Sequence, residues 1–487
     1  MALRPTTCSY RSCLSWRLVP LSSEHFDVVV IGGGPAGYAA ALYGASAGLN
    51  IALVEKNKIG GTCLNVGCIP AKELLETATV FRTVQHAETF GVLAEAKGID
   101  WSKTLARKQG IVDELVGGIS FLLKNRKVTV FDGIGNLLAD HRSVVIGGGS
   151  SGDVTVTGDA IILAAGSVPR TIPGFPIDDH QIVTSDELLS IPELPKSAVV
   201  IGGGAIGCEF ASMMSDLGTD VTILEAAPSI LINCDTDIIK VIERSFKKRD
   251  ITVRAGVMVT GQTTGPDGVT VSFGDGEQVT ADTVVVSIGR RPLSESLGLE
   301  ATQVQVDERG FIVVDEYCRT TVPGVYAAGD VIPTAQLAHV GFAEGMLVIN
   351  DILGEAATPV DYGKLPWAIY CHPEVAFAGM TEAEAKDAGI EVAVSKHRFA
   401  ANGRAKIVGE TDGLVKVIAA KNPDGTAGQI LGVHMVGPWV TEQLGQGYLA
   451  INWEATVSDV AQFIQPHPTM SELFGETVLG LTGRSLH

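Results

Sequence analysis

Residues 60–72 read GGTCLNVGCIPAK, which places Cys63 and Cys68 five positions apart among glycines and just before Pro70. A disulfide needs Cα atoms within roughly 4.4–6.8 Å, whereas residues five apart in an ideal helix rise about 7.5 Å along its axis. A bridge would therefore need a distorted turn, and Gly67 and Pro70 both interrupt a regular helix. Strained, accessible bridges tend to be the labile, catalytic ones. The stretch predicts a redox-active cysteine pair.

Two alternatives remain for this pair: reduced core cysteines, or half of a metal site. Zinc is disfavoured because no histidine or second cysteine pair lies nearby, and we expect no metal. The other cysteines of the chain body, Cys208, Cys234, Cys318 and Cys371, are scattered, and we expect them to be small buried apolar residues.

The composition indicates a multidomain α/β protein. The chain has 487 residues, too many for one hydrophobic core, and 57 of them are glycine. The formal net charge of −19 argues against nucleic-acid or anionic-membrane partners. No apolar run reaches the length of a membrane span, so we expect no membrane insertion.

Residues 1–25 differ from the acidic body of the chain. They carry three arginines and several serines and threonines, with no acidic residue before Glu24. This composition fits an organellar transit peptide or a mis-assigned start codon on a bacterial gene. We favour the second interpretation and expect a cytoplasmic protein, with the mitochondrial matrix as the alternative.

A dinucleotide-binding fingerprint follows this extension. The apolar run 26–31 predicts a buried strand, residues 32–37 read GGGPAG, and a second predicted strand ends at Glu55. In such a unit Gly32 makes the turn, Gly34 lets a pyrophosphate approach, and Gly37 lets the helix pack on the strand. Glu55 is expected to bind the ribose hydroxyls.

The fingerprint is repeated later in the chain. Residues 197–201 predict a strand, Gly202, Gly204 and Gly207 follow, and a second strand ends at Glu225, 18 residues after the last glycine, as in the first copy. Two copies indicate two dinucleotides. Glu225 favours NAD over NADP because Ala226 and Ala227 stand where a 2′-phosphate would need an arginine. Arg254 is the residue that could still reach such a phosphate.

The cysteine motif resembles the redox-active disulfide of the flavin-dependent disulfide reductases, class I of the pyridine nucleotide–disulfide oxidoreductases. The resemblance covers essentially residues 26–480. It implies an α/β fold with two Rossmann-like domains, for FAD and NAD, and a C-terminal α+β dimerisation domain. The implied boundaries are 26–166 for FAD, 167–288 for NAD, 289–360 for the return to the FAD domain, and 361–487 for dimerisation.

The resemblance also implies roles for residues outside the fingerprints. Lys72, on the first helical turn after the motif, would lie near the flavin and pair with Glu209. The remaining residues expected to bind a cofactor lie where strands end or the helix under the flavin begins: Gly135, Gly166, Gly289, Asp330, Gln336, Leu337, Ala338 and His339.

Near the C-terminus, residues 465–472 read QPHPTMSE. Thr469 and Glu472 fit a capping box that starts a helix, in which case His467 is incidental. The resemblance instead implies a His467–Glu472 dyad that acts on the disulfide of the other subunit, so that the enzyme is a homodimer. Gln465 departs from the family, in which many members have a histidine.

The pattern is most similar to the family members that oxidise protein-bound dihydrolipoamide with NAD⁺. Their partners are lipoyl domains of an acyltransferase core or of a glycine-cleavage carrier protein. A glutathione-type reductase is disfavoured by Glu225, and a mercuric reductase by the C-terminal residues 483–487, GRSLH, which lack a cysteine pair. A redox-dead scaffold subunit would have lost a cysteine or the histidine.

The sequence also predicts the remaining elements. We expect two helices within 73–125 and a hairpin with strands over 128–136 and 141–157. For the C-terminal region we expect strands over 367–370, 392–396, 414–418 and 429–436, with helices over 381–388 and 440–453.

Overall fold

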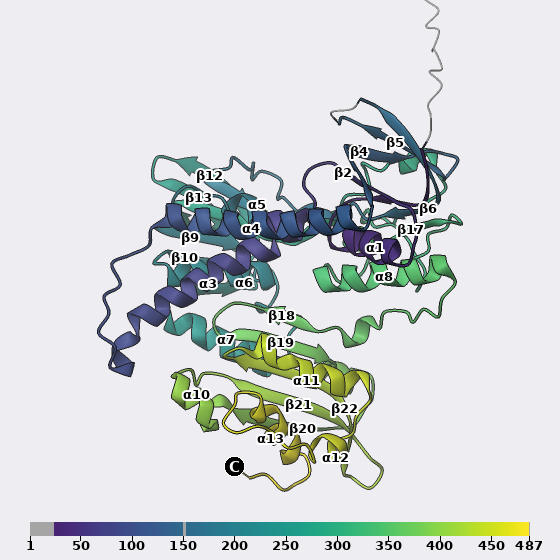
Figure 1. Ribbon diagram of the computed structural model, residues 1–487. Helices are drawn as coiled ribbons and strands as arrows, with labels where there is room; N and C mark the ends of the chain where they lie inside the picture. Colours follow the sequence, from purple (N-terminus) through teal and green to yellow (C-terminus); the bar gives the residue numbers. More distant parts are fainter. Residues whose placement is uncertain (1–23, 150–151, 487) are drawn as a thin grey trace, which may run out of the picture.

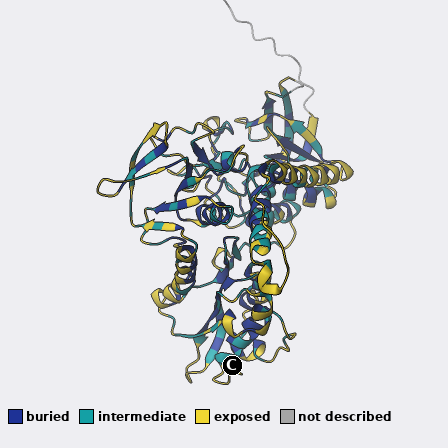
Figure 2. Ribbon diagram, turned by 90° about the vertical axis from the view of Figure 1, so that its left-hand side faces the viewer, coloured by how far each residue is buried: buried dark blue, intermediate teal, exposed yellow. Residues whose placement is uncertain are grey.

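The computed structural model describes residues 24–149 and 152–486, arranged as two α/β units above an antiparallel C-terminal sheet (Figure 1). Residues 1–23 of the expected extension lie outside the described residues, but Glu24 and His25 already belong to the first strand. Buried residues gather in the central strands, and the outer faces of the helices are exposed (Figure 2). Among the described helices, none has the length and apolar character that crossing a bilayer requires.

The first unit is built on a seven-stranded sheet of order β3-β2-β1-β6-β5-β4, in which β17 pairs with β6. Its central strand β1 has both faces covered, as the apolar run predicts, and lies parallel to β2 and β6. Because β17 joins this sheet, the chain returns to the first unit after building the second. The strands are β1 (Glu24–Ile31), β2 (Ile51–Glu55), β3 (Thr129–Asp132), β4 (Ile134–Leu137), β5 (Ser143–Gly147), β6 (Val154–Leu163) and β17 (Val325–Ala327).

The predicted hairpin over 128–136 and 141–157 is wrong in both halves. The second run forms β5 and the start of β6, which pair antiparallel with each other. The first run is divided as well. Gly133, with φ of 145°, divides the run. The part before it forms β3 and pairs in parallel with β2, while the part after it forms β4 and pairs antiparallel with β5. A bend that only glycine adopts easily therefore sends one run of sequence to two edges of the same sheet.

The helices of this unit pack against one another, and α1 contacts both α8 and α4. α1 and α8 lie side by side (Figure 1), and their approach is close because a Cβ on Gly345 would come within 2.5 Å of the Ala36 carbonyl oxygen. The two helices predicted within 73–125 are present, but the first begins earlier, at Cys68. The helices are α1 (Pro35–Ser46), α2 (Gly61–Val66), α3 (Cys68–Gln85), η1 (Ala87–Phe90), α4 (Trp101–Asn125) and α8 (Ala338–Leu353).

The second unit has a five-stranded parallel sheet of order β11-β10-β9-β15-β8, flanked by the three-stranded sheet β12-β13-β14. The chain enters and leaves it through a ribbon of two antiparallel strands, β7 (Ser167–Pro169) and β16 (Arg290–Pro292). Its elements are β8 (Ile182–Thr184), α5 (Ser185–Leu188), β9 (Ser197–Ile201), α6 (Ala205–Asp216), β10 (Asp220–Glu225), α7 (Thr236–Lys248), β11 (Thr252–Ala255), β12 (Val259–Gly265), β13 (Gly268–Phe273), β14 (Glu277–Ala281) and β15 (Thr283–Val286); η2 (Leu299–Ala301) follows β16.

The third part is a five-stranded antiparallel sheet of order β18-β19-β22-β21-β20. All four predicted strands and both predicted helices are present, whereas β19, α10 and α12 were not predicted. α13 begins at Glu472, close to where the capping-box interpretation expected a helix to start. The elements are η3 (Tyr362–Lys364), β18 (Trp367–Ile369), β19 (Glu374–Gly379), α9 (Glu382–Asp387), β20 (Val392–Arg398), η4 (Phe399–Ala401), α10 (Gly403–Val408), β21 (Leu414–Lys421), β22 (Ala427–Gly437), α11 (Val440–Asn452), α12 (Val457–Val460) and α13 (Glu472–Gly480).

The four scattered cysteines are buried, as predicted. Burial raises the thiol pKa of all four: Cys208, Cys234, Cys318 and Cys371. They are therefore protonated at neutral pH, unlike the thiol described next.

Candidate active site

The two cysteines of the motif lie on either side of a break between two helices. Cys63 is in α2 and Cys68 is the first residue of α3, and Gly67 between them has φ of −146° and ψ of −112°. Both side chains are partly buried free thiols. The expected break is at Gly67, whereas Pro70 lies in the first turn of α3, where its missing N–H costs nothing.

The two thiols differ in acidity. A hydrogen bond with Cys63 lowers the pKa of Cys68 to about 7, against the effect of burial and with help from the Lys72 ammonium. The same hydrogen bond, burial and the Cys68 charge raise the pKa of Cys63. Cys68 is therefore the more acidic thiol of the reduced pair, and Cys63 is its hydrogen-bond donor. The disulfide between them stays a prediction.

The cysteine segment rests directly on the first glycine loop. The Gly60 N–H donates to the Gly33 carbonyl oxygen at 2.8 Å, and a Cβ on Gly61 would lie 2.6 Å from the Gly34 Cα. The predicted nucleotide loop and redox pair thus share one unit.

Both glycine loops have the shape of a pyrophosphate cradle. A Cβ on Gly204 would meet nothing within 4 Å, and one on Gly34 only the Gly61 Cα at 3.9 Å. The first glycine of each loop, Gly32 and Gly202, has positive φ. The third, Gly37 and Gly207, packs so tightly that a Cβ would lie 1.8 or 2.0 Å from the carbonyl oxygen of the first. Space therefore exists only beside the second glycine, where the phosphates of a dinucleotide would bind.

The two acidic residues end β2 and β10 in equivalent geometry. Glu55 Oε2 accepts from the Gly33 N–H at 2.7 Å, and Glu225 Oε2 accepts from the Gly203 N–H at 2.5 Å. A carboxylate has about four acceptor positions, so each can also accept from ribose hydroxyls. Arg254 is engaged elsewhere, because its guanidinium lies 3.3 Å from Glu277.

Lys72 and Glu209 meet beside the cysteine pair, as predicted. Lys72 Nζ lies 3.0 and 2.8 Å from the two Glu209 carboxylate oxygens, and 4.9 Å from the centre of the Tyr370 ring. Burial opposes the Lys72 charge, but Glu209 outweighs it and raises the lysine pKa. Lys72 lies in the second turn of α3 rather than the first, because the helix begins at Cys68.

Asp330 lies in a polar cluster that the sequence did not reveal. Its Oδ2 accepts from the Ser167 hydroxyl at 2.5 Å, and that hydroxyl accepts from Arg290 Nε at 2.8 Å. Arg290 also reaches the Thr62 hydroxyl at 3.4 Å, next to Cys63. Burial raises the pKa of Asp330. In the sequence, Arg290 stands out only as one of the two arginines before Pro292, because the residues that it contacts are remote along the chain.

Three further glycines were predicted to bind a cofactor. Two of them follow the main strands of the two units, and the third lies within a strand. Gly166 and Gly289 follow β6 and β15, have positive φ, and would place a Cβ in open space. Gly135 lies within β4, where a Cβ would come within 3.0 Å of Ile31. Packing explains that glycine, so its role toward a cofactor remains only a prediction.

The segment 336–339 leads into α8. Gln336 Nε2 is buried without a partner among the described residues, a donor that a ligand in the first unit could satisfy. Leu337 caps α8 and Ala338 begins it. His339 is exposed, and its Nε2 lies 2.9 Å from the Pro366 carbonyl oxygen. It is held at the helix start, as expected.

The residues of the first unit fit FAD on these grounds: an open cradle at Gly34, an acidic strand end at Glu55, and an unpartnered donor at Gln336. The second unit offers the same cradle and acid to a nicotinamide dinucleotide.

His467 and Glu472 form the predicted dyad. His467 Nδ1 lies 3.0 Å from Glu472 Oε2; the imidazole is 78% exposed, whereas the carboxylate side chain is 9% exposed. The Thr469 hydroxyl does accept from the Glu472 N–H, which is half of a capping box. The Glu472 carboxylate, however, contacts His467 and Asn402. The capping interpretation therefore does not account for this side chain.

Glu209, which pairs with Lys72 beside the thiols, and Glu472 of the dyad lie on helices that contact different strands of the C-terminal sheet within one chain. α6, which carries Glu209, contacts β18, while α13 contacts β20 and β21. The two edge strands are four places apart, about 19 Å at a strand spacing of about 4.8 Å. The two helices therefore reach the C-terminal sheet from different sides.

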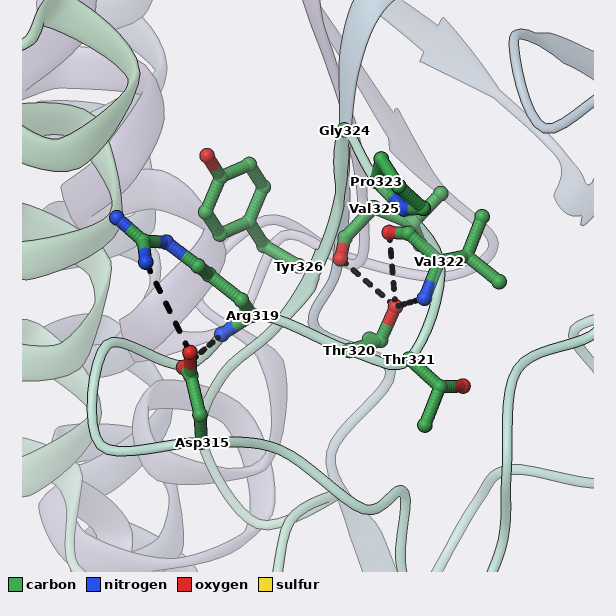
Figure 3. Close-up of a pocket in the computed structure, with 9 residues that line it drawn as sticks. All are labelled: Asp315, Arg319, Thr320, Thr321, Val322, Pro323, Gly324, Val325 and Tyr326. Carbon is green, nitrogen blue, oxygen red and sulfur yellow. Dashed lines mark hydrogen bonds and ion pairs between the residues drawn. The ribbon is translucent and has the colours of Figure 1, made fainter.

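A surface hollow of about 270 Å³ lies elsewhere. It is lined by Asp315 and by residues 319–326, the last two of which belong to β17 (Figure 3). Its polar groups bond among themselves: Asp315 accepts from the Arg319 N–H, and the Thr320 hydroxyl donates to the Val325 carbonyl oxygen. None of the predicted site residues lines it.

Comparisons with known proteins identify the family of this chain. Residues 26–345 match the family model of the pyridine nucleotide-disulphide oxidoreductases, and residues 365–478 match the dimerisation domain of that family. The chain belongs to the pyridine nucleotide-disulphide oxidoreductase family. The family fold and the C-terminal dimerisation domain are as predicted, and so is the homodimer that this domain implies; the enzymes of this group use FAD and NAD.

Individual relatives cover nearly the whole chain. It is 42% identical to a dihydrolipoyl dehydrogenase of Bacillus subtilis over 96% of this chain and all of the relative. It is 38% identical to a mitochondrial dihydrolipoyl dehydrogenase of Arabidopsis thaliana over 96% and 92%. The crystal structure of LpdA from Mycobacterium tuberculosis has a TM-score of 0.88 at 25% identity, covering 94% of this chain and 99% of that one.

Proposed function

We propose that the protein is a dihydrolipoyl dehydrogenase, which oxidises protein-bound dihydrolipoamide to lipoamide with NAD⁺ as acceptor. One observation supports this most strongly. A cysteine pair whose second thiol has a pKa of about 7 lies against the nucleotide loop of the first unit, beside Lys72 and Glu209. The curated relatives of this name extend over almost the full chain.

The first half of the reaction is thiol–disulfide exchange. His467 of the partner subunit takes a proton from one dihydrolipoyl thiol through Nε2, and Glu472 stabilises the resulting imidazolium. The substrate thiolate attacks Cys63 Sγ in the Cys63–Cys68 disulfide, and Cys68 leaves as a thiolate. Its pKa of about 7 makes it a good leaving group.

The second substrate thiol then attacks the substrate sulfur of the mixed disulfide. The lipoyl ring closes, Cys63 leaves and takes up a proton, and both enzyme cysteines are reduced. Lys72 keeps the Cys68 thiolate charged until its electrons are removed. Gly34, Glu55 and Gln336 would hold FAD, and Gly204 and Glu225 would hold NAD⁺. The flavin would supply the electron-transfer chemistry between the thiols and the nicotinamide.

NAD⁺ is the proposed acceptor rather than NADP⁺. Glu225 ends β10; its Oε2 accepts from the Gly203 N–H of the loop at 2.5 Å, and its Oε1 accepts from the Ala227 N–H at 2.6 Å. A 2′-phosphate there would meet a carboxylate instead of an arginine, and Arg254 is paired with Glu277.

We place the enzyme in a complex with lipoyl domains of an acyltransferase core or a glycine-cleavage carrier protein. The dimer contributes one dyad to each site. The proposed location is the cytoplasm, with the mitochondrial matrix as the alternative, since relatives named dihydrolipoyl dehydrogenase come from a bacterium and from plant mitochondria.

An anaerobic spectral titration with dihydrolipoamide, followed by NAD⁺, tests this function. A long-wavelength thiolate–flavin band on reduction and its loss on adding NAD⁺ are expected. The C63S variant is the control, because it has no disulfide to reduce. A flavin that ignores dihydrolipoamide but bleaches with NADPH would contradict the proposal and indicate another disulfide reductase.

A further inference from the structure

Asn402 lies behind the proposed dyad, at the junction of η4 and α10. It is 70 positions from Glu472 in sequence, yet its amide nitrogen lies 3.3 Å from Glu472 Oε1. The side chain is only 2% exposed, so water does not substitute for its contacts.

The backbone around Asn402 determines which way its amide points. Its Oδ1 accepts from the Ala405 N–H at 2.9 Å and so caps α10. The nitrogen is then left to donate, to the Thr469 carbonyl oxygen at 2.9 Å and to Glu472. The amide presents a hydrogen-bond donor to the carboxylate, because the reverse orientation would place its oxygen against two acceptors.

The hydrogen bond from Asn402 determines which carboxylate oxygen of Glu472 is available to His467. With Oε1 taken by Asn402, the other oxygen, Oε2, faces His467 Nδ1. A carboxylate between two donors only accepts, so the histidine donates through Nδ1 and its Nε2 keeps a free lone pair. That lone pair is what a base needs to take a thiol proton.

We propose that Asn402 is a positioning residue for the His467–Glu472 dyad: it fixes the orientation of the carboxylate that holds the histidine in the tautomer with a basic Nε2. This inference rests on the proposed function. It adds a residue that contacts Glu472 across 70 positions of sequence.

The N402D variant separates positioning from capping. Aspartate has the same shape and is an equally good N-cap, but it turns an acceptor toward Glu472 in place of a donor. We expect kcat for dihydrolipoamide oxidation to fall at least about tenfold, with a smaller change in KM. The rate of NADH oxidation by an artificial dye, which bypasses the dyad, serves as the internal comparison.

The matched control is N422D. Asn422 is exposed in the same C-terminal part, beyond the end of β21, and its change adds the same charge away from the dyad. We expect this variant to match the wild type in both reactions. If N402D yields no folded protein, N402S applies the same test, because serine caps the helix and cannot reach Glu472 as the amide does.

The double variant N402D/E472Q tests direct coupling. The introduced glutamine could donate to the introduced aspartate and still accept from His467. The exchange therefore restores the hydrogen bond between the two side chains, although the Thr469 carbonyl oxygen loses its donor. We expect its turnover to exceed that of N402D and of E472Q. Losses that simply add, equal losses in the dithiol and dye reactions, or an N402D rate within twofold of the wild type would each overturn the proposal. A wild type that does not oxidise dihydrolipoamide would instead refute the proposed function, and this inference with it.

Discussion

The Lys72 ammonium nitrogen lies 2.8 Å from Glu209 Oε2, across 137 positions of sequence. Lys72 is on α3 of the first unit and Glu209 is on α6 of the second. Glu209 also accepts from the Tyr370 N–H at 2.9 Å, at the edge of the C-terminal sheet. Three parts of the chain therefore meet at one ion pair beside Cys68, so the charge near the thiolate depends on how they are assembled.

Removing the lysine should raise the pKa of Cys68. The hydrogen bond from Cys63 remains in K72M, but the cation that favours the thiolate is lost and Glu209 is left beside it. We expect the pKa to rise from about 7 by about one unit or more, so that the thiolate fraction at pH 7 falls. Ultraviolet thiolate absorbance of the reduced enzyme against pH measures this, with K72R as the charge-preserving control. An unchanged titration in K72M would contradict the assigned role.

Two glycines of the second loop should respond differently to alanine. At Gly204 a Cβ meets nothing within 4 Å and φ is −74°, so G204A should fold normally. Its methyl group would occupy the space proposed for the NAD pyrophosphate, and we expect the KM for NADH to rise at least about tenfold.

G207A should instead destabilise the second unit, because its Cβ would lie 2.0 Å from the Gly202 carbonyl oxygen. Thermal unfolding and NADH kinetics of the two variants, compared with the wild type, check both statements. Equal losses of stability in both variants would argue against an open cradle at Gly204.

The sequence was sufficient to predict motifs whose residues are close together or repeated along the chain. It was not sufficient to predict residues whose contacts are with side chains far away in sequence. The fingerprints could be recognised because each strand, turn and acid lies within about 30 residues. The Lys72–Glu209 pair was predicted only through the family resemblance. Arg290 and Asn402 have no local signal, since Ser167 and Glu472, which define their roles, are far away in sequence. β19 was missed because it directly follows β18, and the predicted hairpin failed at the bend of Gly133.

The buried ion cluster around Lys416 should be the strongest polar contact between the second unit and the C-terminal sheet. Lys416 is 1% exposed on β21, and its Nζ lies 2.8 Å from Asp235 and Asp237 and 2.7 Å from Glu382. Methionine of similar length would leave the buried Asp235 without its cation. We expect K416M to lower the free energy of unfolding by about 3–5 kcal/mol.

Urea or thermal unfolding of K416M measures this loss, and K421M is the matched control. Lys421 ends the same strand but is exposed, so its replacement should change stability by less than about 0.5 kcal/mol. A loss of the same size in both variants would mean that the cluster contributes no more than a surface charge.

The separation between thiols and dyad predicts complementation between two inactive variants. Because α6 and α13 contact opposite edges of the C-terminal sheet, about 19 Å apart, His467 should serve the Cys63 of its partner. C63S and H467A homodimers should both fail to oxidise dihydrolipoamide. After co-expression, half of the dimers are mixed and one of their two sites is intact, so about a quarter of the wild-type rate should return. The mixed dimer can be isolated with two different affinity tags, and the isolated mixed dimer should have about half of the wild-type rate. If dyad and thiols acted within one chain, every mixed dimer would stay inactive, since each chain lacks one of the two groups.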